Sequence, residues 1–226
     1  MVLGGGGRTL RSVSAVVLKV VAGMVGFLLV GNLAILAASV WARQTTPAAT
    51  PTPESLPGVD NLQVVDDRLW RGAAPTTEGY RALAGAGTTT VVDLRAEEGL
   101  EGDARMVTDL GMKLVRLPVR DGQVPSTEKI EEFLAATQEP GAKVFVHCGA
   151  GVGRTGAMVG AYQVANGESN GRGALRQNLA VGPPSLEQVA FVASLKGDEL
   201  DRPNAVLTSM SRVLDAPRRI WSRYGG

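Results

Sequence analysis

Residues 143–156 read KVFVHCGAGVGRTG, and the expected fold is built outward from this stretch. Residues 143–147 form a short apolar run with β-branched side chains, which is typical of a buried strand. A glycine-rich turn follows, and residues 155–165 favour a helix. The backbone N–H groups of such a turn converge, and the helix dipole adds partial positive charge. Strand, turn and helix together therefore predict a cradle for an anion.

Two side chains determine which reaction this cradle is suited to. Arg154 supplies a planar fork that holds two oxygens of a tetrahedral oxyanion. Cys148 lies at the bottom of the cradle, where positive potential favours the thiolate. The alternative is a buried structural cysteine in an ordinary strand–helix turn. An arginine six residues after the cysteine, with glycines between them, favours a thiolate nucleophile aimed at a bound phosphate.

Strand and helix signals alternate along the chain on both sides of this stretch. The predicted strands are residues 63–71 (a hairpin turning at Asp66 and Asp67), 88–94, 113–119 and 143–147. The predicted helices are residues 76–86, 103–110, 126–137 with Ser126 as N-cap, 155–165, 172–179 and 185–195. This alternation predicts an α/β fold, with a central and largely parallel sheet flanked by helices. Such sheets place a reactive loop at the C-terminal end of a central strand.

The stretch resembles the signature loop of the cysteine-dependent protein tyrosine phosphatases, which reads His-Cys, five residues, Arg-Thr/Ser-Gly. The matching residues are His147, Cys148, Gly151, Arg154, Thr155 and Gly156. The resemblance is to bacterial dual-specificity-like members, and it implies a tyrosine-phosphatase-like fold and hydrolysis through phosphocysteine. It also implies that substrate phosphate binds to the loop residues Gly149, Ala150, Gly151, Val152 and Gly153 together with Arg154.

The same resemblance implies three further catalytic roles. In these phosphatases an Asp upstream of the signature gives a proton to the leaving oxygen, and Asp121 is the candidate here. Asp121-Gly122 is otherwise a common turn pair. Asp121 would then act as base when water attacks the phosphocysteine. His147 would orient the loop and hold Cys148 as thiolate, and Thr155 would donate its hydroxyl to the sulfur.

Other charged and polar residues receive structural interpretations. Arg95 matches a Leu-Arg pair of bacterial members and is expected to form an ion pair that fixes a loop. The segment 70–72 with Pro75 resembles the start of the family's domain and is interpreted as structural. Gln188 is similar to a water-positioning Gln of some relatives, but its surroundings differ, so it is not a candidate. Four acidic residues are assigned to a charged surface loop: Glu97, Glu98, Glu101 and Asp103.

The five-residue loop also bears on the substrate. Inositol-lipid phosphatases of the superfamily often carry Lys there, whereas this loop holds Gly149 and Val152. The expected substrate is therefore a singly phosphorylated group: phosphotyrosine, or phosphoserine and phosphothreonine if the pocket is shallow. A phosphoinositide phosphatase and a catalytically silent phosphate-binding module are the alternatives. A rhodanese-like sulfurtransferase ranks last, because it has no need of Asp121 and Thr155.

Composition excludes several classes of protein. Lys and Arg number 23 against 22 Asp and Glu, so nothing in the net charge indicates a nucleic-acid partner. With one Cys and one His, neither an internal disulfide nor a Cys/His metal site is expected. No cofactor is predicted.

The N-terminal part contains a candidate membrane segment. Residues 20–41 carry no charge and reach roughly 33 Å as a helix at about 1.5 Å per residue, enough to cross a bilayer core. Trp41 suits an interface, and Arg43 ends the run. A cleaved signal peptide is the main alternative to an uncleaved single-pass anchor. Basic residues concentrate before the segment, which predicts a domain on the extracytoplasmic side.

Five regions follow from these signals. They are a basic segment at residues 1–19, a transmembrane helix or signal anchor at 20–42, a Pro/Thr-rich linker at 43–58, a phosphatase domain at 59–200 and a tail at 201–226. The tail combines apolar residues at helical spacing with a basic, aromatic end. It is interpreted as a closing helix, with attachment to an anionic membrane surface as the alternative.

Overall fold

The computed structural model describes residues 6–46, 56–97, 101–197 and 205–214. Its sheet has five strands in the order β1-β2-β5-β3-β4. In chain order they are β1 (Gln63–Val64), β2 (Leu69–Gly72), β3 (Thr90–Arg95), β4 (Lys113–Val119) and β5 (Val144–His147). β1 and β2 are antiparallel, whereas β2, β5, β3 and β4 run parallel to one another. The predicted α/β fold with a largely parallel sheet is confirmed.

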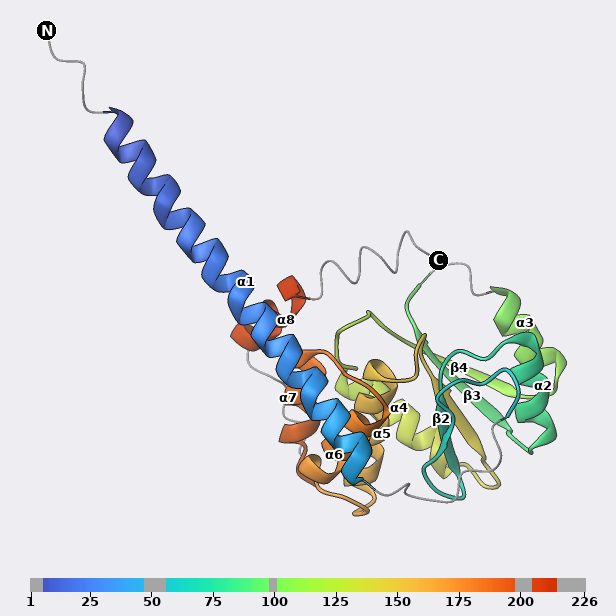
Figure 1. Ribbon diagram of the computed structural model, residues 1–226. Helices are drawn as coiled ribbons and strands as arrows, with labels where there is room; N and C mark the ends of the chain where they lie inside the picture. Colours follow the sequence, from blue (N-terminus) through green and yellow to red (C-terminus); the bar gives the residue numbers. More distant parts are fainter. Residues whose placement is uncertain (1–5, 47–55, 98–100, 198–204, 215–226) are drawn as a thin grey trace, which may run out of the picture.

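Helices cover both faces of this sheet. They are α1 (Gly6–Thr45), α2 (Thr77–Gly85), α3 (Glu101–Asp109), α4 (Thr127–Gln138), α5 (Gly153–Ala165), α6 (Gly171–Val181), α7 (Leu186–Ser194) and α8 (Ala205–Leu214). Figure 1 shows α4 to α7 on one side of the sheet and α2 and α3 on the other. This double cover explains why β3 and β5 are almost continuously buried.

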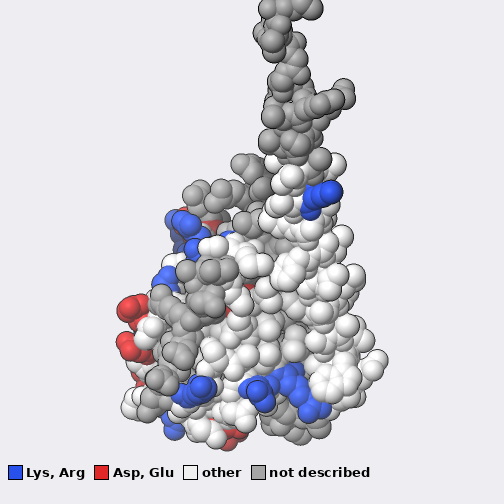
Figure 2. Space-filling model, turned by 90° about the vertical axis from the view of Figure 1, so that its left-hand side faces the viewer, with Lys and Arg blue, Asp and Glu red and all other residues white. Residues whose placement is uncertain are grey.

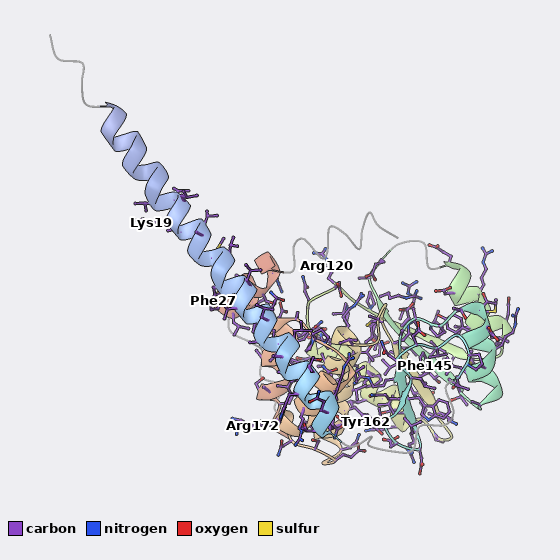
Figure 3. All side chains as sticks on the ribbon, viewed as in Figure 1. Lys19, Phe27, Arg120, Phe145, Tyr162 and Arg172 are labelled. Carbon is purple, nitrogen blue, oxygen red and sulfur yellow. The ribbon has the colours of Figure 1, made fainter. Side chains whose placement is uncertain are left out.

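Alternation along β5 divides the core between the two faces. Val144 and Val146 pack toward α4, α5 and α7, whereas Phe145 packs toward α2 and α3. All three side chains are fully buried. Figure 3 shows Phe145 and Tyr162 inside the domain, while Lys19 and Phe27 project from the part of α1 that extends beyond it. A central strand buried on both sides gives the loop that follows it a rigid base.

The local predictions hold to within a few residues. Asp66 turns the β1–β2 hairpin by accepting hydrogen bonds from the backbone N–H groups of Arg68 and Leu69 at 2.7 and 2.8 Å. β4 has the predicted bounds, and α5 begins at Gly153, two residues before the predicted start. Ser126 occupies the N-cap of α4, but its side chain makes no capping hydrogen bond.

The C-terminal end of α1 requires a correction. The linker was expected to begin at residue 43, but α1 continues to Thr45. The last turns of α1 are held in place by contacts with α6. Ser39 Oγ donates to the Leu179 carbonyl at 2.6 Å, and Arg43 Nη2 donates to the Val181 carbonyl at 2.7 Å. Ala42 is fully buried, so the last turns of α1 belong to the packed domain.

α1 is also a helix long and apolar enough to cross a membrane. Within residues 16–45 an 18-residue window reaches a mean hydropathy of 2.3, and most of the described apolar side chains from Val16 to Trp41 are exposed. Figure 2 shows the described residues of α1 as a column with few charged atoms, next to a domain that carries more of them. Length and composition alone suit a span, so insertion and orientation stay predictions.

α8 provides the helix expected in the tail. It packs on α7, where Ser211 Oγ accepts a hydrogen bond from the Glu187 backbone N–H at 3.0 Å, and Ser211 is fully buried. The basic, aromatic end of the tail lies outside the described residues.

Candidate active site

The glycine-rich turn joins the C-terminal end of β5 to the N-terminus of α5. β5 has β2 on one side and β3 on the other, so the turn opens at the centre of the sheet edge. Cys148 is the first residue after β5 and is 3% exposed. Cys148, the candidate nucleophile, therefore lies at the sheet edge where parallel sheets place their sites.

Close packing explains three of the glycines. Gly151 has φ +72°, and a Cβ there would overlap the backbone of Gly72 in β2. A Cβ at Gly153 would overlap the side chain of Gln188, and one at Gly156 would overlap that of Asn178. The turn and the start of α5 are thus enclosed by β2, α6 and α7, and the absence of a side chain at these glycines permits this approach.

Arg154 is buried behind the loop and fixed by neighbours from other segments. Its Nη1 donates to both carboxylate oxygens of Glu97 at 2.9 and 3.0 Å and to the Val119 carbonyl at 3.1 Å. Its Nε lies 3.5 Å from Asp121 Oδ1. Burial opposes the charge, but Cys148, Glu97 and Asp121 outweigh it and raise the pKa of Arg154. The guanidinium is therefore both oriented and charged.

Asp121 lies in the loop between β4 and α4. The structure brings it to the edge of the glycine-rich turn, as its contact with Arg154 shows. Its side chain is a quarter exposed, so solvent reaches it. Ser185 Oγ donates to the carbonyl of the next residue, Gly122, at 2.7 Å, and Gln188 Nε2 donates to the Gln123 carbonyl at 3.0 Å. Asp121-Gly122 therefore forms a turn, and the side chain of the candidate acid extends from this same loop.

His147 is fully buried, with its Nδ1 3.2 Å from the Cys148 carbonyl oxygen. Its ring stacks on Phe145 and meets Tyr80 edge-on. Burial lowers the pKa of His147 to about 4, against the opposing effect of Asp93. The ring is consequently neutral at neutral pH, and it acts on the loop through hydrogen bonding and packing.

Thr155 lies in the first turn of α5 and is fully buried. Its Oγ1 has no hydrogen-bond partner among the described residues. The bond from this hydroxyl to the Cys148 sulfur, expected from the resemblance, is therefore not formed in the structure. The buried Thr155 hydroxyl is therefore available to donate a hydrogen bond to the Cys148 thiolate. This role stays a prediction.

Two acidic residues assigned to a surface loop have specific partners instead. Glu97 follows β3 and pairs with Arg154, which lowers the pKa of Glu97 although burial opposes this. Asp103 lies in the first turn of α3 and pairs with Arg95 at 2.7 Å, while Arg95 also binds Asp93 at 2.9 Å. The ion pair expected of Arg95 is present. Glu97 was missed, although its place after a parallel strand already indicated this edge of the sheet.

Gln188 also belongs to the site. It forms a capping box with Ser185 at the start of α7, and its Oε1 accepts from the Ser185 backbone N–H at 2.9 Å. Its side chain lies against Gly153 and holds the loop of Asp121 through Gln123. Gln188 was set aside at the level of sequence because its neighbouring residues differ from those of the water-positioning Gln in relatives. Its contact with Gly153 was therefore not predicted.

A family described as "DSP-PTPase phosphatase fused to NAD+ Kinase" matches residues 58–194 of the chain. Probable NAD kinase 2, chloroplastic, from Oryza sativa subsp. japonica is 33% identical over 111 residues, which cover 46% of this chain and 11% of that protein. Putative tyrosine phosphatase 067L of Invertebrate iridescent virus 3 is 31% identical over 105 residues, 43% of either chain. The chain thus spans less than half the length of these relatives.

Solved structures share the fold. The core catalytic domain of the PP-IP phosphatase SIW14 from S. cerevisiae superposes with a TM-score of 0.56 at 16% identity, over 74% of this chain and 98% of that one. P. aeruginosa TpbA in complex with pTyr gives 0.52 at 19% identity, over 75% and 98%. At such identities the likeness concerns the fold. Since the family match covers more than half of the chain, this protein belongs to the DSP-PTPase phosphatase family named for its fusion to NAD+ kinase, within the cysteine-dependent protein tyrosine phosphatases.

Proposed function

We propose that this protein hydrolyses phosphate monoesters through a phosphocysteine on Cys148. One observation carries the proposal. Asp121, which comes from a separate loop, lies 3.5 Å from the guanidinium of Arg154, at the turn that begins with Cys148. Nucleophile, oxyanion cradle and proton donor therefore meet at one sheet edge.

The first step follows from these positions. The Cys148 thiolate attacks phosphorus, an S–P bond forms, and the P–O bond to the leaving group breaks. Protonated Asp121 gives its proton to the departing oxygen, which avoids a poor alkoxide or phenoxide leaving group. The amides of the turn and Arg154 hold the non-bridging oxygens while negative charge is redistributed.

The second step releases phosphate. Water attacks the phosphocysteine while the Asp121 carboxylate takes its proton, and the S–P bond breaks. Thr155 donates to the departing sulfur, which eases return of the thiolate. Inorganic phosphate and the original enzyme are the products.

The substrate we propose is phosphotyrosine in a protein, with phosphoserine and phosphothreonine as further substrates. Gly149 and Val152 place no cation in the turn to meet additional phosphates. α1 is proposed as a single-pass anchor, with the catalytic domain on the extracytoplasmic side.

The test uses full-length protein in detergent with p-nitrophenyl phosphate and a phosphotyrosine peptide. Cys148→Ser should abolish turnover of both. Asp121→Asn should lose far more rate on the peptide, whose leaving group needs the proton, than on the nitrophenyl ester. Equal rates for wild type and Cys148→Ser would refute the mechanism. If wild type binds phosphate but turns over neither substrate nor a panel of phosphoinositides, it is a phosphate-binding module.

A further inference from the structure

The phosphate-binding turn is held by its carbonyl groups. In a planar trans peptide the N–H and C=O point in opposite directions, so a carbonyl fixed outward leaves the N–H pointing inward. The Gly149 carbonyl accepts from the Ala74 backbone N–H at 2.9 Å. The Ala150 carbonyl accepts from Asn61 Nδ2 at 3.0 Å, and the Gly151 carbonyl from Arg71 Nη2 at 2.8 Å. Three successive peptide groups are thereby oriented.

All three donors come from one short segment. Residues 61–74 contain the β1–β2 hairpin and its flanks, and β2 pairs with β5 in parallel register, so that Gly72 faces His147. The segment consequently ends beside the turn that follows β5. In sequence, Asn61 and Ala150 are separated by 89 positions, and Arg71 and Gly151 by 80.

Asn61 shows backbone strain at the point of contact. It is the one non-glycine residue with positive φ, at +52°, in the part of the chain that the structure describes. Asn tolerates this region better than most residues, and such strain concentrates at functional positions. Asn61 is exposed, so core packing does not account for the contact between its amide and the turn.

Arg71 contributes a buried charge. It is 3% exposed, and its Nη2 also donates to Val152 O at 3.4 Å and Asn178 Oδ1 at 3.2 Å. No carboxylate lies within ion-pair distance of it among the described residues, and its Nε has no partner there. Burial lowers the pKa of Arg71 to about 10, against the opposing effect of Cys148, so it is charged at neutral pH.

An unpaired buried cation is costly to maintain. The anions that would compensate Arg71 are the Cys148 thiolate and the phosphate that the turn receives. The interpretation of residues 70–72 as simply structural is therefore incomplete.

We propose that Asn61 and Arg71 are positioning residues of the phosphate-binding turn. Both keep its carbonyls outward and its amides directed at the phosphate, and Arg71 adds a second buried positive charge beneath it. This inference rests on the proposed phosphatase function. Neither side chain transfers a proton or forms a bond to phosphorus.

The test compares full-length variants with p-nitrophenyl phosphate as substrate and tungstate as competitive oxyanion inhibitor. Asn61→Gly keeps the positive φ and removes the amide, so the KM and the tungstate inhibition constant should each rise about fivefold, as expected for one lost hydrogen bond. Arg71→Met should lower kcat/KM at least a hundredfold. Arg71→Lys should recover most of that loss, because it restores the charge.

Arg68→Met is the matched control, since Arg68 is exposed in the same hairpin. It should retain wild-type kinetics. If Arg71→Met does not fold, as judged by its thermal unfolding, Asn61→Gly carries the test. The proposal is overturned if Asn61→Gly keeps wild-type kcat/KM and tungstate inhibition, or if every loss follows the fraction of folded protein alone.

Failure of the proposed function gives a different pattern. If wild type itself has no turnover, tungstate binding to the same variants is measured by isothermal titration calorimetry. Weaker binding by Asn61→Gly and Arg71→Met then supports the positioning roles in a binding module. Unchanged binding refutes them.

Discussion

Arg154 and Glu97 form an ion pair in which one guanidinium nitrogen contacts both carboxylate oxygens, at 2.9 and 3.0 Å. The two residues come from α5 and from the segment after β3, and the pair fixes the plane of the guanidinium. Nη1 is occupied by Glu97 and Val119, and Nε lies 3.5 Å from Asp121 Oδ1, so we propose that Nη2 meets the substrate oxygens. The Glu97 carboxylate would then set which edge of Arg154 faces the substrate phosphate.

Removal of this carboxylate should misalign Arg154. We expect Glu97→Gln to lower kcat/KM for p-nitrophenyl phosphate about tenfold, mostly through a higher KM, since a charge-assisted contact is replaced by a weaker one. Steady-state kinetics measure the effect. Glu101→Gln, an exposed change in the first turn of α3, is the control. Equal losses in both variants would contradict a specific role for Glu97.

Two features of Gly151 require glycine at this position. Both its φ of +72° and the contact with the Gly72 backbone exclude a side chain. Gly151→Ala should reduce kcat/KM more than a hundredfold, because the turn must move away from β2. Gly141→Ala is the matched control, since Gly141 has φ +74° but open space around its Cβ position. If the two variants lose the same activity, backbone strain alone explains the effect.

His147 links stability to pH. Its pKa is about 4 in the folded protein and near 6.5 in an unfolded chain, so the unfolded state binds more protons between these values. The free energy of unfolding should therefore fall as pH drops from about 6.5 to about 4, by about 3 kcal/mol in total. Asp93 and Glu97, whose pKa values are lowered, add to the loss at still lower pH.

Urea denaturation at several pH values measures this dependence. His147→Gln removes the titrating ring, and its stability should change less between pH 6.5 and 4.5 than that of wild type. A steeper or equal slope in the variant would show that other groups are responsible.

The sequence predicted those features that local patterns encode. The β-branched run of β5, the glycines after it and the spacing from Cys148 to Arg154 are contained within residues 143–156. The partners of Arg154 and of the turn carbonyls are different. Glu97, Asn61 and Arg71 reach the site only because β2 and β3 pair with β5, and strand order follows from tertiary packing rather than from any local signal.

The end of α1 illustrates the same limit. Hydropathy locates the apolar run, but the helix continues to Thr45 because α6 receives it. Arg176 Nη2 donates to the Thr45 carbonyl at 2.8 Å, and its guanidinium lies 5.1 Å from the ring of Trp41. α6 lies far from α1 in the sequence, so the local sequence of α1 does not show where the helix ends.

The packing of the C-terminal end of α1 on α6 should contribute to the stability of the domain. Ala42 is fully buried against it, whereas Ala37, on the same helix, is exposed. Ala42→Leu inserts a larger side chain into a packed contact and should lower the free energy of unfolding by about 1–3 kcal/mol. Ala37→Leu makes the same change on the exposed face and should be close to neutral. Urea denaturation of full-length protein in detergent, followed by circular dichroism, compares the two.

The contact between α1 and α6 also lies near the glycine-rich turn. Gly182, which follows α6, is so close to Val152 that a Cβ would approach its side chain to 2.9 Å. A shift of α6 in Ala42→Leu should consequently raise the KM for p-nitrophenyl phosphate by a few-fold, even under conditions where the protein is fully folded. If the stability of Ala42→Leu and Ala37→Leu is the same, α1 leaves α6 without cost and the domain is independent of it.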